Sequence, residues 1–287
     1  MKSVPRPIPV KGEDTGEVRR FFDGWGLYWR VVDRDYLSHK EVYTRLNDFL
    51  KAHFQKPFTL IDLGCGDSSY MVRGLAGTKI SRYIGIDLTA AALRLARENL
   101  TGLGYETTFI AGDFIRLLRK QKTGAEVVWA CLSIHHLSLE QKHAFFKDCR
   151  GALGRGGYLL IYEPVLKPGE ARPEYLARFR EITAEQWKAV TRREMEEVVK
   201  HVSGADFPES LATFETLARE NGFGETRFLF HDPNELYSML CFSVGAQNHH
   251  RRGRPPRFTP QVQRPGRPGQ EEAQRLRYVQ KEILKIT

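Results

Sequence analysis

Three acidic residues in this sequence follow short apolar runs at a spacing that suits the binding of a nucleoside. Asp62 lies in IDLGCGDSSY, Asp87 in YIGIDLT and Asp113 in AGDF. Carboxylates accept hydrogen bonds from ribose hydroxyls and from amino groups such as that of adenine. If the three runs are neighbouring parallel strands, the carboxylates meet at one edge of a sheet, where such sheets bind their ligands.

A Gly-x-Gly turn follows the first of these runs. Gly64 and Gly66 flank Cys65, so a ligand can approach the backbone closely and meet its N–H groups. Asp87 comes 21 residues after Gly66, where an acidic residue suits the two ribose hydroxyls of an adenosine ligand. An ordinary tight turn and an N-capping or solvated Asp87 are the alternative interpretations.

The third carboxylate has two compatible interpretations. If Asp87 holds the ribose, Asp113 lies near the adenine amino group; because Asp113 also precedes a predicted helix, it is a candidate N-cap. Ser69 occupies the place of the third glycine in the NAD-binding pattern GxGxxG, and the chain has no GxxxxGK[ST] motif. Both observations disfavour a dehydrogenase or a nucleotide triphosphatase.

The fourth apolar run ends in CLSIHH, which places His135 and His136 at the same edge of the predicted sheet. Histidine can take a proton at neutral pH, so either residue is a candidate general base. A packing or hydrogen-bonding histidine is the alternative. No Asp, His and Glu cluster has metal-ligand spacing in the sequence, so we expect no metal.

Apolar runs alternate with amphipathic segments through the middle of the chain, a pattern typical of a parallel sheet covered by helices on both faces. The expected strands are Phe58–Leu63, Arg82–Ile86, Thr107–Ile110, Glu126–Cys131 and Gly157–Tyr162. The expected helices are Ser69–Leu75, Ala90–Leu100, Phe114–Arg119 and Glu140–Leu153.

Helical segments precede this series. We expect a flexible arm over residues 1–17 and a helical lid over 18–54, within a domain that spans 18–245. Tyr36 and His39 are candidates to cover a ligand, whereas most of the other aromatic residues of the lid fit a core.

A charged insertion follows the fifth strand. It covers 168–203, contains Trp187, and is a candidate wall for a second ligand, with a solvated helix face as the alternative. A helix over Glu209–Glu220 and a hairpin of Glu225–His231 with Leu236–Val244 then complete the sheet.

The net charge of +9 is concentrated at the end of the chain. Residues 246–287 carry ten Lys and Arg against three Glu, whereas the first 245 residues carry 34 basic and 32 acidic groups. The tail is rich in Arg, Pro and Gly, which predicts disorder. Contact with nucleic acid is therefore expected only through the tail.

Together the motifs resemble the class I S-adenosylmethionine (SAM)-dependent methyltransferases, and the HHL step is similar to their small-molecule branch. The resemblance covers 58–244 and rests on IDLGCGDSS, YIGIDLT, AGDF, VVWACLSIHHLS and GALGRGGYLLIYEP, in family order. It implies an α/β Rossmann-like three-layer sandwich with a seven-stranded, mostly parallel sheet whose last strand is antiparallel. It also implies SAM as the cofactor.

The resemblance assigns roles to individual residues. SAM would lie across the Gly64–Gly66 turn with its ribose on Asp87 and its adenine near Asp113 and Phe114. Asp62 would hold its methionine amino end, directly or through water. The resulting cofactor-binding set is Asp62, Gly64, Cys65, Gly66, Asp87, Leu88, Asp113, Phe114 and Cys131, with Tyr36 from the lid.

The expected function is transfer of the SAM methyl group to an oxygen, nitrogen or sulfur atom of a small molecule by in-line displacement. The alternatives are a methyltransferase acting on RNA or protein recruited by the tail, an inactive SAM-binding partner protein, and a nicotinamide-dependent oxidoreductase. With no run of about 20 apolar residues, no apolar signal region and no CxxC spacing among four cysteines, a cytoplasmic enzyme is expected.

Overall fold

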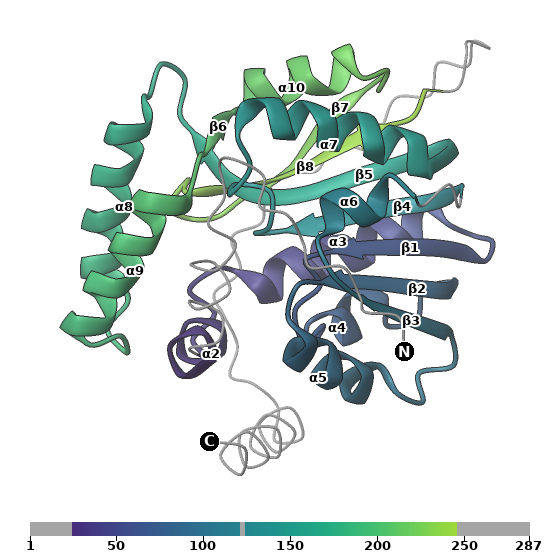
Figure 1. The fold of residues 1–287 in the computed structure, drawn as a ribbon, viewed down its shortest axis with the longest axis horizontal. Coiled ribbons are helices and arrows are strands. Elements are labelled where there is room, and N and C mark those ends of the chain that lie inside the picture. Colours follow the sequence, from purple (N-terminus) through teal and green to yellow (C-terminus); the bar gives the residue numbers. More distant parts are fainter. Residues whose placement is uncertain (1–24, 121–123, 246–287) are drawn as a thin grey trace, which may run out of the picture. The chain divides into compact units, whose positions relative to one another are not determined.

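The computed structural model describes residues 25–120 and 124–245, which form a sheet with helices on both faces (Figure 1). The predicted arm 1–17, the first part of the lid and the tail 246–287 lie outside the described residues. No helix in the described ranges is long and apolar enough to cross a membrane.

The sheet has the strand order β3-β2-β1-β4-β5-β8-β7, with the short strand β6 paired to β5 off this path. Its strands are β1 (Phe58–Leu63), β2 (Ile80–Asp87), β3 (Glu106–Ala111), β4 (Ala125–Cys131), β5 (Leu153–Leu166), β6 (Glu209–Ser210), β7 (Thr226–His231) and β8 (Tyr237–Ser243). The pairs among β1 to β5 are parallel, whereas β8 runs antiparallel to both β5 and β7. The predicted seven-stranded sheet with an antiparallel last strand is confirmed.

Alternate side chains of the strands enter two separate cores, which accounts for the three layers. Leu60 of β1 and Trp129 of β4 pack on one face, whereas Ile61 and Val128 pack on the other. The first face is covered by α3 (His39–His53) and α4 (Met71–Leu75), and α5 (Ala90–Leu100) contacts α4, β2 and β3. The second face is covered by α6 (Phe114–Leu118), α7 (Leu139–Ala152) and α10 (Leu211–Glu220).

The insertion after β5 forms two helices, α8 (Arg172–Gln186) and α9 (Arg192–Ala205). Figure 1 shows them beyond the carboxyl ends of β4 and β5, beside α2 (Trp25–Asp33). Tyr175 and Phe179 of α8 and Val198 and Val202 of α9 join the core on the α3 side of the sheet. The insertion is thus packed against the sheet and shares its core.

Two elements differ from the prediction. β5 runs from Leu153 to Leu166, whereas the expected strand covered only Gly157–Tyr162, so β5 also includes Gly154 and Gly156. A Cβ on Gly154 would lie 2.7 Å from Gly124 O, which shows how closely two backbones approach there. Residues 209–210, expected to open a helix, instead pair with β5 as β6.

Candidate active site

A cavity of about 250 Å³ opens at the carboxyl ends of β1, β2 and β4. It brings together nine of the twelve residues that the sequence predicts to bind the cofactor or to act in catalysis. These are Gly64, Cys65, Gly66, Asp87, Leu88, Phe114, Cys131, His135 and His136. Asp62, Asp113 and Tyr36 do not line it. The ligand roles of all twelve remain predictions.

The turn after β1 requires glycine at its first position. Gly64 has a φ of +71°, a left-handed conformation that side chains disfavour, and a Cβ there would meet the Cβ of Ser133 at 2.7 Å. The N–H groups of Gly64 and Cys65 both donate to Ile86 O, at 2.8 and 3.1 Å. These bonds hold the turn against the end of β2, next to Asp87.

Asp87 is held by two backbone hydrogen bonds. Its Oδ2 accepts from Gly66 N at 2.9 Å, and its Oδ1 accepts from Thr89 N at 2.8 Å. Burial raises the pKa of Asp87, and both hydrogen bonds act in the opposite direction. A carboxylate offers about four acceptor positions, so the fixed group still has acceptor capacity for a ligand.

Asp62 lies behind the turn. It is 2% exposed and accepts a hydrogen bond from the Tyr83 hydroxyl at 2.7 Å. That hydroxyl also lies 2.9 Å from Ser68 Oγ, so the three side chains form a buried polar chain. Burial raises the pKa of Asp62 to about 7.

Asp113 has the N-cap geometry that was one of its two interpretations. It accepts a hydrogen bond from Ile115 N at 2.9 Å at the start of α6, and Arg116 lies 3.5 Å from its other oxygen. Phe114, the next residue, lines the cavity.

Tyr36 connects the predicted lid to the insertion. Its ring stacks on Trp187 with 5.2 Å between centroids, and its hydroxyl accepts from Ala189 N at 2.9 Å. Leu37, between α2 and α3, and His39, the first residue of α3, line the cavity together with Trp187, so this part of the predicted lid contributes to the wall. His39 is fully buried, and burial lowers its pKa to about 4.

The chain reverses sharply after β4. Leu132 has a φ of +51°, a conformation that costs a non-glycine residue on the order of 1–3 kcal/mol. The turn directs the backbone N–H groups of Ser133 and Ile134 to one carboxylate oxygen of Glu163, at 2.8 and 3.0 Å. Glu163 is fully buried on β5 and was not singled out from the sequence, although it lies in the motif IYEP.

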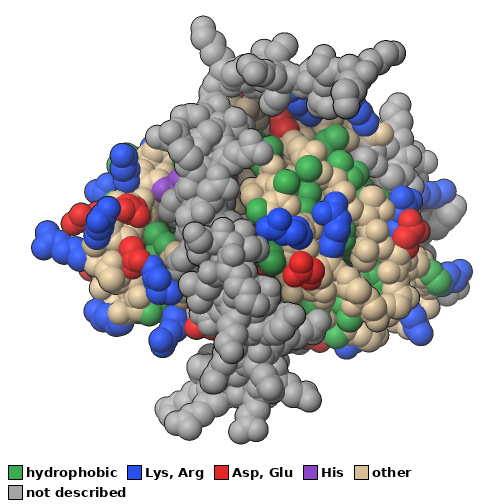
Figure 2. Space-filling model, turned by 60° about the horizontal axis from the view of Figure 1, so that its bottom comes forward, with side chains coloured by type: hydrophobic (Ala, Val, Ile, Leu, Met, Phe, Trp, Pro, Cys, Tyr) green, Lys and Arg blue, Asp and Glu red, His purple; other side chains and the backbone are tan. Residues whose placement is uncertain are grey.

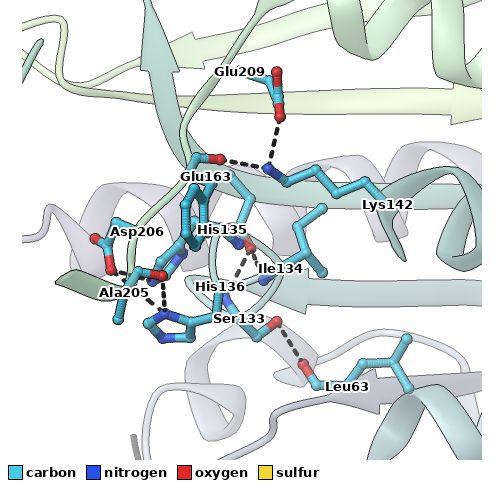
Figure 3. Close-up of polar contacts among 11 residues, drawn as sticks. Leu63, Ser133, Ile134, His135, His136, Lys142, Glu163, Ala205, Asp206 and Glu209 are labelled. Carbon is cyan, nitrogen blue, oxygen red and sulfur yellow. Dashed lines mark hydrogen bonds and ion pairs between the residues drawn. The ribbon is translucent and has the colours of Figure 1, made fainter. Parts of the chain in front are cut away.

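His135 is paired with Glu163, as Figure 3 shows. Its Nδ1 lies 2.6 Å from Glu163 Oε2, and its Nε2 lies 3.8 Å from Asp206 Oδ1. Burial lowers the pKa of His135 to about 3 and raises that of Glu163 to about 7. Above that pH the carboxylate is ionised, so Nδ1–H donates to it and Nε2 is the unprotonated nitrogen.

His136 and Asp206 lie beside this pair. His136 Nδ1 is 3.2 Å from Ala205 O and 3.4 Å from Asp206 Oδ1. His201 of α9 packs edge-on against the His136 ring, with 5.5 Å between centroids. Burial lowers the pKa of His136. Asp206 had no signal in the sequence, because it follows α9 and belongs to no motif.

The segment that carries Asp206 is fixed from three sides. Phe207 N donates to His135 O at 2.7 Å, and Arg172 Nε donates to Asp206 O at 2.7 Å. The buried Lys142 of α7 donates to Phe207 O and forms an ion pair with Glu209 at 2.9 Å. Figure 3 shows Lys142 reaching this segment from the far side of His135.

Asp67 is a third carboxylate that was not singled out from the sequence. It is 5% exposed and lines the cavity, and its Oδ1 accepts from Ser69 N and Oγ. Its Oδ2 is buried and has no hydrogen-bond partner among the described residues. Its place inside IDLGCGDSS, directly after Gly66, was the available signal.

The far end of the cavity is apolar. Its wall combines residues of α8, α9, β8 and the loop after α8, namely Phe179, Trp187, Val198, Val202 and Tyr237. The lining therefore combines polar groups at the glycine turn with apolar side chains from the insertion, and the two histidines also line the cavity.

Comparisons with known proteins agree with this arrangement. Residues 60–157 match the family model described as a methyltransferase domain. The curated alpha N-terminal protein methyltransferase 1 of Arabidopsis thaliana is 27% identical over 182 residues, which are 55% of this chain and 64% of that protein. Carboxy-S-adenosyl-L-methionine synthase of Nautilia profundicola is 22% identical over 165 residues, 58% of this chain and 67% of that protein.

Solved structures show the same fold. Human N-acetylserotonin methyltransferase in complex with SAM superimposes with a TM-score of 0.57 at 13% identity, over 83% of this chain and 61% of that chain. The chain thus matches a methyltransferase domain over residues 60–157 and shares the fold of the class I SAM-dependent methyltransferases. This chain spans only about two thirds of the length of its two curated relatives.

Proposed function

We propose that this chain transfers the methyl group of SAM to a small molecule. The supporting observation is that one cavity joins the Gly64–Gly66 turn and Asp87 to the apolar wall formed by the insertion. A cofactor bound at the Gly64–Gly66 turn and an acceptor bound against the insertion would then lie in the same cavity.

The cofactor placement follows from the fixed groups at the polar end. SAM lies across the turn with its ribose hydroxyls on Asp87 and its adenine against Phe114, near Asp113. Its methionine amino group is a suitable partner for Asp67, whose buried Oδ2 lacks one. Asp62 lies behind the turn, so it acts on that amino group through water.

The acceptor end favours a compact molecule with an aromatic or aliphatic body. Trp187, Phe179 and Tyr237 present ring surface, and the valines of α9 supply the rest of the wall. Aromatic side chains bind flat apolar groups well. The acceptor brings one nucleophilic oxygen, nitrogen or sulfur atom to the histidine side of the cavity.

The reaction is an in-line displacement. The nucleophile forms a bond to the methyl carbon, the carbon–sulfur bond breaks, and its electron pair neutralises the sulfonium to give S-adenosylhomocysteine. The acceptor proton passes to His135 Nε2 or to solvent. Because the sulfonium is already an activated leaving group, alignment in a dry cavity supplies much of the rate enhancement.

A macromolecular acceptor is the second candidate. It rests on the relative from Arabidopsis thaliana, whose name describes a protein methyltransferase, and on the basic tail. On the face drawn in Figure 2, the visible basic and acidic side chains are interspersed, which favours the small molecule over a nucleic acid on the visible part of that face.

The proposal is tested by calorimetry with SAM, S-adenosylhomocysteine and NAD, followed by mass spectrometry of reactions with a library of small acceptors. We expect both adenosyl ligands to bind, NAD not to bind, and one class of acceptor to gain 14 mass units, the mass of an added CH₂. Binding of NAD alone would point to an oxidoreductase. SAM binding with turnover only on RNA or protein would replace the small acceptor.

A further inference from the structure

We propose that His135, His136 and Asp206 bind a divalent transition-metal ion, such as Zn²⁺ or Fe²⁺, in this cavity. Two imidazoles and one carboxylate are a ligand set that such ions use in catalytic sites with open positions. The three residues come from two segments that lie far apart in the sequence. His135 and His136 are in the turn after β4, and Asp206 directly follows α9.

The distances suit a single ion. One ligand atom from each of the three residues can be chosen so that all lie within 4.8 Å of one another. Asp206 Oδ1 is 3.8 Å from His135 Nε2 and 3.4 Å from His136 Nδ1. Metal–ligand bonds of about 2.0–2.2 Å place neighbouring ligand atoms about 3.0–3.5 Å apart. A small movement of the side chains therefore brings the three ligand atoms to the separations expected around one metal ion.

The hydrogen bonding around His135 is that of a metal ligand. Histidines that bind metals donate their other ring N–H to a carboxylate or a carbonyl, which fixes the nitrogen that faces the ion. Glu163 occupies this position at 2.6 Å from His135 Nδ1. The carboxylate is itself held by the N–H groups of Ser133 and Ile134, so the ring has little freedom to rotate.

Two buried atoms in the cluster lack a hydrogen-bond partner. Asp206 Oδ1 and His136 Nε2 are both buried with none among the described residues. An unsatisfied buried polar atom costs about 1–3 kcal/mol, and more when it is charged. A cation next to Asp206 Oδ1 removes that penalty. If His136 Nδ1 binds the ion, its contact with Ala205 O is given up and the ring proton moves to Nε2.

The nearby cationic side chains of Lys142 and Arg172 bind other groups and do not pair with the Asp206 carboxylate. Lys142 Nζ binds Phe207 O and Glu209, and the Arg172 guanidinium binds the backbone oxygens of Asp206 and Ser203. Among the described residues, neither forms a hydrogen bond or ion pair with the Asp206 carboxylate. The carboxylates of Asp206 and Glu163 balance the charge of a divalent ion.

The use of the ion in catalysis rests on the proposed function. Three protein ligands leave open positions on the cavity side, where an acceptor hydroxyl or thiol can coordinate. Coordination lowers the pKa of such a group, as it does for metal-bound water. The acceptor proton is then released to solvent, and the remaining lone pair attacks the methyl carbon.

The test uses the full chain after dialysis against a chelator. Co²⁺ is added and its visible absorption is recorded, and Zn²⁺ affinity is measured by competition with a chromophoric chelator. We expect one ion per chain. D206N is expected to weaken binding at least about 100-fold, and E163Q to weaken it about 10–100-fold through the orientation of His135. H143Q, at an exposed position on α7, is the matched control and should bind like the wild type.

Each outcome is decisive. Far-ultraviolet circular dichroism of every variant reports folding, and D206N is an isosteric change that tests the site even if E163Q unfolds. Absence of binding by the wild type at millimolar metal, or equal affinity of wild type and D206N, would overturn the proposal. SAM affinity is measured in parallel, so loss of metal binding with intact SAM binding separates failure of this site from failure of the proposed function.

Discussion

Asp87 is the residue on which cofactor binding should depend most strongly. Replacing it by Asn retains the size of the side chain but removes the charge and one acceptor, so it can no longer satisfy Gly66 N, Thr89 N and two hydroxyls together. Hydrogen bonds to charged groups contribute about 1.5–3 kcal/mol, so we expect about 10–100-fold weaker SAM binding by calorimetry. Asp48→Asn, at an exposed position on α3, is the matched control. Unchanged affinity of Asp87→Asn would place the ribose elsewhere.

Asp62 should make the stability of the ligand-free protein fall as the pH rises. Its folded pKa of about 7 lies above the usual aspartate value of 3.8, so the folded state binds more protons than the unfolded state between these values. The stabilisation is complete below pH 4 and is lost as the pH passes through 7; the shift corresponds to at most about 4 kcal/mol. Urea unfolding at pH 5 and pH 8 should show a smaller loss for Asp62→Asn than for the wild type. A parallel loss in both proteins would mean that Asp62 is ionised throughout.

At the scale of single residues, the sequence motifs predicted those site residues whose positions depend on one short stretch of chain. Gly64, Gly66 and Asp87 line the cavity because a strand, a turn and the next strand position them. Asp206 and Glu163 were missed for a physical reason. Asp206 matters because the segment after α9 approaches the turn after β4, and Glu163 matters because β5 pairs with β4 and reaches the same turn.

Among the elements, α9 depends on its first turn. Thr191 Oγ1 accepts from Glu194 N while the Glu194 carboxylate accepts from Thr191 N, and Glu194 also pairs with Arg30 of α2. Thr191→Ala should cost about 1 kcal/mol in urea unfolding, because a capping bond is lost. Since α9 carries Val198 and Val202, acceptor KM should rise while SAM affinity stays the same. Glu197→Ala, on an exposed face of α9, serves as the control and should leave both stability and KM close to wild type.

The elements were predicted well where apolar periodicity decides them. The seven main strands and the helix Ala90–Leu100 follow from alternation and spacing. The length of β5 was underestimated because its glycines resemble a turn, whereas in the fold they allow close backbone contacts. The strand β6 is formed by pairing with β5, which two residues of sequence cannot indicate.

At the scale of the whole chain, the charge is divided between a nearly neutral domain and a basic tail. Removing residues 246–287 takes away ten basic and three acidic groups. If the acceptor is small, the truncated protein should bind SAM and turn over the acceptor as the full chain does. RNA binding by the full chain, measured by fluorescence anisotropy from 50 to 300 mM salt, should be weak and steeply salt-dependent. Turnover that disappears with the tail would instead favour a macromolecular substrate.

The closure of the α8–α9 hairpin has a consequence for protein engineering. Arg172 at the start of α8 donates hydrogen bonds to the backbone oxygens of Ser203 and Asp206 at the end of α9. These bonds hold the two ends of the hairpin together without using residues 173–202. Chimeras that exchange only 173–202 with another enzyme would change which molecule is modified while keeping Asp206 in place. Exchanges that extend through Asp206 would remove that carboxylate as well as the acceptor wall. The end point of the exchanged segment therefore determines whether the Asp206 carboxylate is kept.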